Sequence, residues 1–343
     1  MSVATPTMWF VFIAIVAFAL FVDFVVLNRQ GAHRVEFREA AIWSLIWIAV
    51  SLAYMGVMWW ELGGTSGDPM LEAKAGESAM AYLTGYMVEK ALAVDNIFVF
   101  LMLFTYFSVP PQFQKRALMF GVLGALILRT VLILIGAWLI SSFHWILYVF
   151  GAFLLFTGVK MWVAADQEPD LTNNPALSWI RKRFRIANDF DGEKFFTQEN
   201  GLRVATPLFV VVALIGIVDV VFAVDSIPAI FAITTDPFIV LTSNVFAILG
   251  LRAMYFLLAD LKERFHLLPY GLAVVLVFVG TKMLLLDIYH IPMLWSLLIT
   301  VSILTLTIIL SVVIKPTGAH ALGAYPFTAK AAKPSTQNKP DSQ

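Results

Sequence analysis

The sequence has 343 residues, of which 60% are hydrophobic and only 13% are charged, and its mean hydropathy is +0.84. A water-soluble core cannot bury so much apolar surface, so we expect a membrane protein. The formal net charge is zero, which gives no sign of a nucleic-acid partner. Cysteine is absent, and this excludes disulfides, thiolate catalysis and direct thiol redox chemistry.

Nine apolar runs are long enough to cross a bilayer as helices, which takes about 17 to 25 residues. The first begins at Met8 with no Lys or Arg before it, so it lacks the basic region of a signal peptide and is expected to be retained. The runs are continuous, which favours helices over alternating barrel strands and predicts an all-α polytopic fold. They cover residues 8–27, 41–60, 79–107, 117–139, 145–163, 204–234, 238–258, 269–286 and 291–314.

Basic residues fall almost entirely on one side of these predicted spans. Because cytoplasmic loops keep Lys and Arg, this places the N-terminus outside and the C-terminus inside. Lys74 is the one basic residue expected on the outer side. Five others lie within or at the ends of spans, namely Lys90, Arg129, Lys160, Arg252 and Lys282. For Lys160 and Lys282 we expect the ammonium groups to extend to the headgroups. Arg129 and Arg252 are expected to serve as counter-charges or gates.

A charged motif occurs twice in the chain. The passage EKALAVDNIFVF from Glu89 and the passage DVVFAVDSIPAIF from Asp219 align without a gap, at an offset of 130 residues. Arg129 in the fourth run then corresponds to Arg252 in the seventh, and a Gly-x-Lys-Met passage occurs in the fifth and the eighth run. Three predicted helices therefore occur twice. The third run crosses inward and the sixth crosses outward, so the two units are inverted, which is typical of secondary transporters.

The predicted organisation follows the chain. It comprises two peripheral helices in 1–60, a first three-helix repeat in 79–163, a cytoplasmic loop with some amphipathic helix in 164–203, an inverted second repeat in 204–286, a ninth helix in 291–314 and a disordered cytoplasmic tail in 315–343.

The two motifs place carboxylates inside the membrane, where each charge costs about 2.5 to 3.5 kcal/mol. A proton, an arginine or lysine, or a bound cation must compensate them. Pro228 predicts that the sixth span unwinds or kinks just after Ser226, and Gly85 is a weaker candidate for a break in the third. Such breaks would let the carboxylates converge. The candidate ligands are Glu89, Asp95, Asn96, Asp219, Asp225 and Ser226.

This oxygen-only set suits a hard divalent ion such as Mn²⁺, Mg²⁺ or Ca²⁺. A purely structural ion-pair network is the alternative for the same carboxylates. The five histidines lie away from the motifs, which disfavours zinc and copper; they are His33, His144, His266, His290 and His320.

The motif pair, together with the run DVVFAVDSIPAIFAITTDPFIVLTSNVFAILGLRAMYF, resembles the TerC family of membrane proteins, close to its Alx-type members, over about residues 8–314. The resemblance implies Mn²⁺ export across the bacterial inner membrane, with Mn²⁺ as the transported ion and no permanently bound cofactor. It also implies that the six motif residues handle the ion. One departure is Gly216, where many family members carry an acidic residue.

Other functions stay open at this point. A proton-coupled exporter of an organic solute would use the carboxylates as proton carriers. A tellurium-resistance or redox-associated membrane protein is a further alternative from the resemblance. An intramembrane aspartyl protease also uses two aspartates, but Asp95 and Asp225 lack a Tyr-Asp or Gly-x-Gly-Asp context. Without a Walker motif we expect no ATP hydrolysis, and the protein is predicted to be a transporter, not an enzyme, with a divalent ion and the lipid bilayer as partners.

Overall fold

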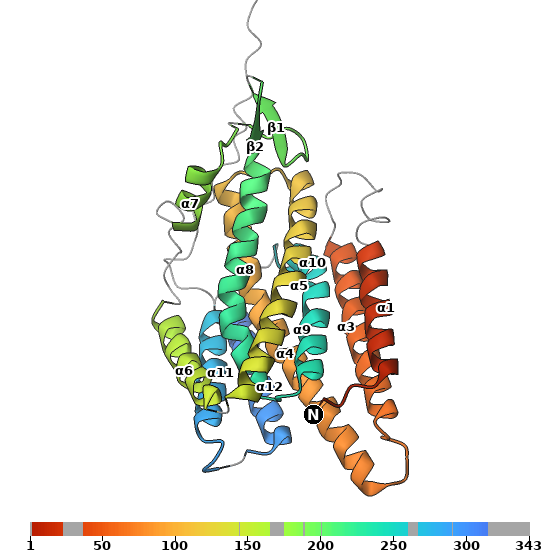
Figure 1. Ribbon diagram of the computed structural model, residues 1–343. Coiled ribbons are helices and arrows are strands. Elements are labelled where there is room, and N and C mark those ends of the chain that lie inside the picture. Colours follow the sequence, from red (N-terminus) through yellow and green to blue (C-terminus); the bar gives the residue numbers. More distant parts are fainter. Residues whose placement is uncertain are drawn as a thin grey trace, which may run out of the picture.

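The computed structural model describes residues 2–22, 37–143, 145–164, 175–187, 189–199, 201–259, 267–289 and 291–314. Helices form a bundle over most of these ranges (Figure 1). They are α1 (Pro6–Phe21), α3 (Phe37–Glu61), α4 (Pro69–Tyr106), α5 (Pro111–Ser142), α6 (Ile146–Ala164), α7 (Pro175–Arg183), α8 (Pro207–Phe231), α9 (Pro237–Leu249), α10 (Leu251–Ala259), α11 (Leu268–Leu284) and α12 (Met293–Val313).

Five helices are long and apolar enough to cross a membrane, namely α3, α5, α6, α8 and α12, and the bent pair α9 and α10 makes a sixth. The helices α1 and α11 are apolar but shorter, with 16 and 17 residues. The 38-residue α4 carries Glu89, Lys90 and Asp95 in its middle. The described residues thus form a polytopic helical membrane protein. The full set of nine crossings stays a prediction, since parts of the chain between them lie outside these ranges.

The break in the helices lies in a different span from the one predicted. The helix α8 continues through Pro228 to Phe231, and α4 runs unbroken through Gly85, so the predicted unwinding after Ser226 is wrong. Pro228 lies in the last turn of α8, where the lost donor removes one bond from a helix that is about to end. A bend of 43° instead separates α9 from α10 at Gly250. Beside this bend, Lys90 Nζ donates to the Ala247 carbonyl at 3.3 Å.

The segment predicted as a cytoplasmic loop also departs from an all-α fold. It contains α7 and an antiparallel hairpin of β1 (Phe196–Glu199) and β2 (Leu202–Ala205), with Phe196 opposite Ala205. Phe209 at the start of α8 packs on Phe184 and Phe196, with ring centroids 5.2 and 4.9 Å away. Apolar side chains between the basic residues therefore anchor the hairpin to the bundle.

Two helices from opposite halves of the chain, α6 and α11, pack closely and antiparallel. A Cβ added at Gly280 would lie 2.8 Å from the Gly151 carbonyl oxygen, and one added at Gly158 would lie 2.9 Å from that of Ala273. Backbone atoms cannot move aside as a side chain can, so these glycines set the distance between the two helices.

Replacing Gly280 by Ala is expected to destabilise the protein by about 1 to 3 kcal/mol, the usual cost of overpacking. The measurement is the thermal unfolding temperature of the purified protein in detergent. The matched control is Gly124→Ala on α5, where an added Cβ meets nothing within 4 Å. This control should be neutral or slightly stabilising, because Ala favours a helix over Gly by about 0.5 to 1 kcal/mol. Equal unfolding temperatures for the two variants would contradict the close packing of α6 on α11.

Candidate functional site

A buried arginine lies at the centre of the charged motifs. Arg129, midway along α5, is 1% exposed. Its Nε and Nη2 atoms donate to the two carboxylate oxygens of Asp219 at 3.1 and 2.9 Å. Its Nη1 atom donates to Glu89 Oε1 and, at 3.4 Å, to Ser226 Oγ. One guanidinium thus joins a carboxylate from the first motif to a carboxylate from the second.

Asn96 completes the shell around the guanidinium. With its amide oriented so that the oxygen faces Arg129, the oxygen accepts from Nη2 at 3.2 Å and the nitrogen donates to the Leu92 carbonyl at 3.0 Å. A guanidinium has five N–H donors. Asp219 takes two of them and Glu89, Ser226 and Asn96 take one each, so the arginine is fully satisfied.

The cluster carries more negative than positive charge. Glu89 is 0% exposed and Asp219 is 2% exposed, so both carboxylates and the single guanidinium are removed from water. When all three are ionised, their sum is one negative charge. The second oxygen of Glu89, Oε2, is buried and accepts no hydrogen bond from any side chain or backbone group that the structure describes. A buried charge without a partner is costly, so a proton or a further cation would stabilise this cluster.

Helical spacing explains how these side chains meet. Glu89 and Asn96 are seven residues apart and share one face of α4, and Asp219 and Ser226 share one face of α8 in the same way. Small residues then let α5 approach α8 on both sides of Arg129. A Cβ added at Gly121 would lie 2.7 Å from the Ile215 side chain.

The antiparallel course of α4 and α8 follows from a further contact. Gly85 precedes Glu89 by one turn and lies against Ile230, which follows Ser226 by one turn. The two motifs therefore lie side by side and run antiparallel, and the first acidic residue of each contacts Arg129.

Two of the six predicted residues are not placed in the cluster. Asp225 is half-buried and accepts from Thr157 Oγ1 of α6 at 3.1 Å, with the charge of Lys160 nearby. Six residues of unbroken helix leave its side chain about 120° around the helix from that of Asp219, and α8 has no break that would bring it back. The side chain of Asp95 lies outside the described residues, as do all five histidines. Glu89, Asn96, Asp219 and Ser226 are the predicted residues that the structure brings together.

Other polar groups in the bundle are placed differently from the sequence-based expectation. Lys282 does not extend to the headgroups: its side chain is buried and its Nζ donates to Ser296 of α12 at 3.2 Å. Arg252, the repeat counterpart of Arg129, lines a groove at one end of the bundle. The fully buried Asn244 of α9 was not predicted, and neither atom of its amide has a partner among the described residues.

The described residues contain no group of three or more His, Asp or Glu side chains close enough to hold a metal ion. In this arrangement the guanidinium of Arg129 lies between the carboxylates of Glu89 and Asp219. The open space around Gly216, where an added Cβ meets nothing within 4 Å, leaves room for a side chain one turn before Asp219.

Comparison with known proteins identifies what the chain is similar to. The family described as "Integral membrane protein TerC family" matches residues 74–319. A protein of Escherichia coli (strain K12) named "Putative membrane-bound redox modulator Alx" is 55% identical over 310 residues, which cover 90% of this chain and 95% of that protein. An "Uncharacterized membrane protein STKORF319" of Myxococcus xanthus is 43% identical over 312 residues, or 91% of this chain and 94% of that protein. No solved structure matches.

Proposed function

Because the chain belongs to the TerC family of integral membrane proteins, as its sequence motifs predicted, we propose that it is a secondary transporter that exports a hard divalent cation, with Mn²⁺ as the first candidate. The observation that carries this proposal is the buried cluster of Glu89, Asp219 and Arg129, which has an excess negative charge and an unpartnered carboxylate oxygen among the described residues. Intramembrane charges of this kind mark ion pathways.

The donor set fits a hard cation. Glu89 and Asp219 offer carboxylate oxygens, Asn96 an amide oxygen and Ser226 a hydroxyl, and Mn²⁺ prefers oxygen ligands of this type. All four now contact Arg129, so an arriving cation competes with the guanidinium for them. Cation entry would release Arg129 from Glu89 or Asp219, and return of the guanidinium would expel the cation. This exchange couples ion binding to a movement of α5 against α4 and α8.

Reciprocal packing supports the two inverted repeats that alternating access requires. In the proposed repeat, residues of α6 and α11 that correspond are 122 positions apart, so Gly158 corresponds to Gly280 and Gly151 to Ala273. Gly158 contacts Ala273, and their counterparts Gly280 and Gly151 contact each other in the same way. In the same way α4 packs on α9, and their counterparts in the proposed repeat, α8 and α5, pack on each other. A two-fold axis between the halves produces contacts of this kind, and in such transporters the ion site lies at the repeat interface.

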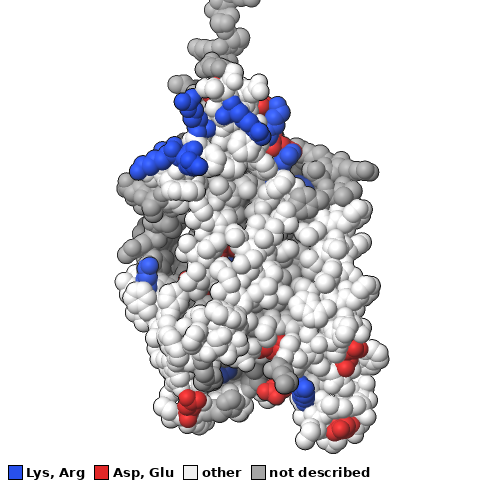
Figure 2. Space-filling view, in the orientation of Figure 1, with Lys and Arg blue, Asp and Glu red and all other residues white. Residues whose placement is uncertain are grey.

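Charge distribution supports an orientation of the bundle in the membrane. Lys and Arg gather at the end of the bundle that holds β1, β2 and α7, while acidic groups predominate at the opposite end in this view (Figure 2). By the positive-inside rule the basic end would face the cytoplasm, and Pro6, at the start of α1, would then lie on the outer side of the inner membrane.

A proton-coupled exporter of an organic solute is the second candidate, since a proton would also neutralise the cluster. The name of the Escherichia coli relative raises a redox role. This chain has no cysteine, so a redox role here would not run through its own thiols.

The test is Mn²⁺ flux in proteoliposomes that contain the purified protein, with Mg²⁺ and Ca²⁺ as competitors. We expect Mn²⁺ uptake or release that is faster than in empty vesicles and that responds to an imposed ion or proton gradient. If no divalent ion moves under any gradient, metal export is wrong and organic solutes become the next substrates to measure.

A further inference from the structure

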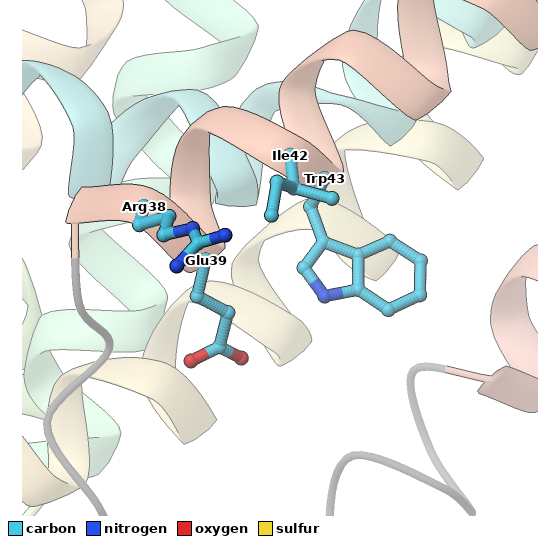
Figure 3. Close-up of a pocket in the computed structure, with 4 residues that line it drawn as sticks. All are labelled: Arg38, Glu39, Ile42 and Trp43. Atoms are coloured by element: carbon cyan, nitrogen blue, oxygen red, sulfur yellow. The ribbon is translucent and has the colours of Figure 1, made fainter.

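A charged groove lies at the basic end of the bundle, apart from the carboxylate cluster. Its open part has a volume of about 250 Å³ and is lined by Arg38, Glu39, Ile42 and Trp43 at the start of α3 (Figure 3). A narrower cleft, also lined by Glu39 and Trp43, extends to α5 and α10. This cleft adds Ala40, Lys115, Arg252, Ala253 and Phe256.

The groove collects basic side chains from three separate helices. Arg38 comes from α3, Lys115 from α5 and Arg252 from α10, and Glu39 is the one acidic residue of the lining. The lining therefore carries two net positive charges, which favours an anionic ligand. Arg252 is the intramembrane arginine that the carboxylate cluster does not use, and its place in this groove gives it a separate role.

The groove lies where the apolar surface of the bundle meets its basic end. Along α3, the outward residues that follow Arg38 are large and apolar: Ile42, Leu45 and Ile46 are 48%, 66% and 41% exposed. In a membrane protein such a face contacts lipid chains. Trp43 lies among them, and tryptophan is enriched at the level of the headgroups. A ligand in this groove is thus placed with its charge at the interface and with an apolar helix face beneath it.

We propose that this groove binds the phosphate of an anionic phospholipid, with an acyl chain lying along Ile42 and Leu45. Basic pockets between membrane helices on the cytoplasmic side recognise such headgroups. A guanidinium such as that of Arg38 can donate two hydrogen bonds to a phosphate, and Arg252 and Lys115 add positive charge to the lining. The volume is below the 300 to 1,000 Å³ typical of enclosed small-molecule sites, which suits a headgroup whose tails remain in the bilayer.

The experiment titrates the full-length protein in an uncharged detergent with phosphatidylglycerol and counts bound lipids by native mass spectrometry. Phosphatidylcholine is the zwitterionic comparison. Arg252→Gln and Lys115→Gln are each expected to weaken phosphatidylglycerol binding about fivefold, the contribution of one basic residue near anionic lipid. Arg252→Lys, which keeps the charge, should weaken it less. Lys182→Gln is the matched control, because Lys182 lies at the same basic end on α7 but outside the groove.

Several outcomes would overturn the proposal. Equal weakening by Lys182→Gln would mean that lipid binds to the basic end as a whole. Equal binding of phosphatidylcholine would remove the role of charge. Displacement of the lipid by millimolar inorganic phosphate would identify a site for a soluble anion. Arg252→Gln could lose lipid binding simply because it fails to fold. Lys115→Gln guards against this, because it changes a half-buried side chain near the start of α5; unchanged lipid binding in a folded Lys115→Gln variant would contradict the proposal.

Discussion

Replacing Arg129 by Gln is expected to cause the largest loss of stability of any single substitution in the cluster. The change leaves Glu89 and Asp219 buried without their counter-charge, and removal of one partner from a buried ion pair costs about 3 to 5 kcal/mol. The thermal unfolding temperature of the variant in detergent should therefore fall far below that of the wild type.

Divalent cations should restore part of this stability. With the guanidinium gone, Mn²⁺ can bind both carboxylates without competition, and a ligand present at 100 times its dissociation constant stabilises the folded state by about 2.7 kcal/mol. The control is the double variant Arg129→Gln, Asp219→Asn, in which one of the two carboxylates is neutral. If Mn²⁺, Mg²⁺ and Ca²⁺ raise the unfolding temperature of the single variant no more than that of the control, the cluster is a structural ion-pair network.

Replacing Glu89 by Gln is expected to abolish most ion transport while it preserves the fold. Gln has the same shape and its amide oxygen can still accept from Arg129, but the cluster then has no excess negative charge. A contact with a charged group contributes about 1.5 to 3 kcal/mol, and 1.4 kcal/mol corresponds to a factor of ten. Mn²⁺ flux in proteoliposomes should therefore fall about 10- to 100-fold at low ion concentration.

Asp225→Asn is the matched comparison for Glu89→Gln. It removes one negative charge from an acidic residue that the sequence groups with Glu89 but that the structure turns toward Thr157 of α6. Mn²⁺ flux in this variant should stay within about threefold of the wild type, since an exposed or half-exposed ion contact contributes less than about 1 kcal/mol. An equal loss in both variants would show that Asp225 belongs to the ion pathway and that another conformation brings the two faces of α8 to one ion.

Arg129 and Arg252, which the sequence alignment pairs, lie in different surroundings. Arg129 is fully bonded within the cluster, whereas Arg252 lies in the groove at the basic end. The side chains around the two arginines thus differ between the two halves of the chain. The buried cluster takes one carboxylate from each half but its guanidinium from the first half alone.

The hydropathy of the sequence by itself determined that the chain is a helical membrane protein, because apolar runs of this length have no other stable solvent than lipid. The spacing of residues in the sequence also determined which side chains share a face of a helix. Glu89 with Asn96, and Asp219 with Ser226, meet Arg129 together because the helical period places residues seven apart on one side. The paired motifs were likewise sufficient to predict the family.

Tertiary structure decided where the helices bend and how each one is rotated against its neighbours. Pro228 predicts a break by local rules, yet α8 continues past it, while the bend lies at Gly250, where Lys90 of α4 reaches the α9 backbone. Rotation of α8 sends Asp219 toward Arg129 and Asp225 toward Thr157. No local pattern contains this rotation, because it depends on which residues of distant helices are small enough to let backbones approach, as Gly121 does for α5 and Gly280 for α11.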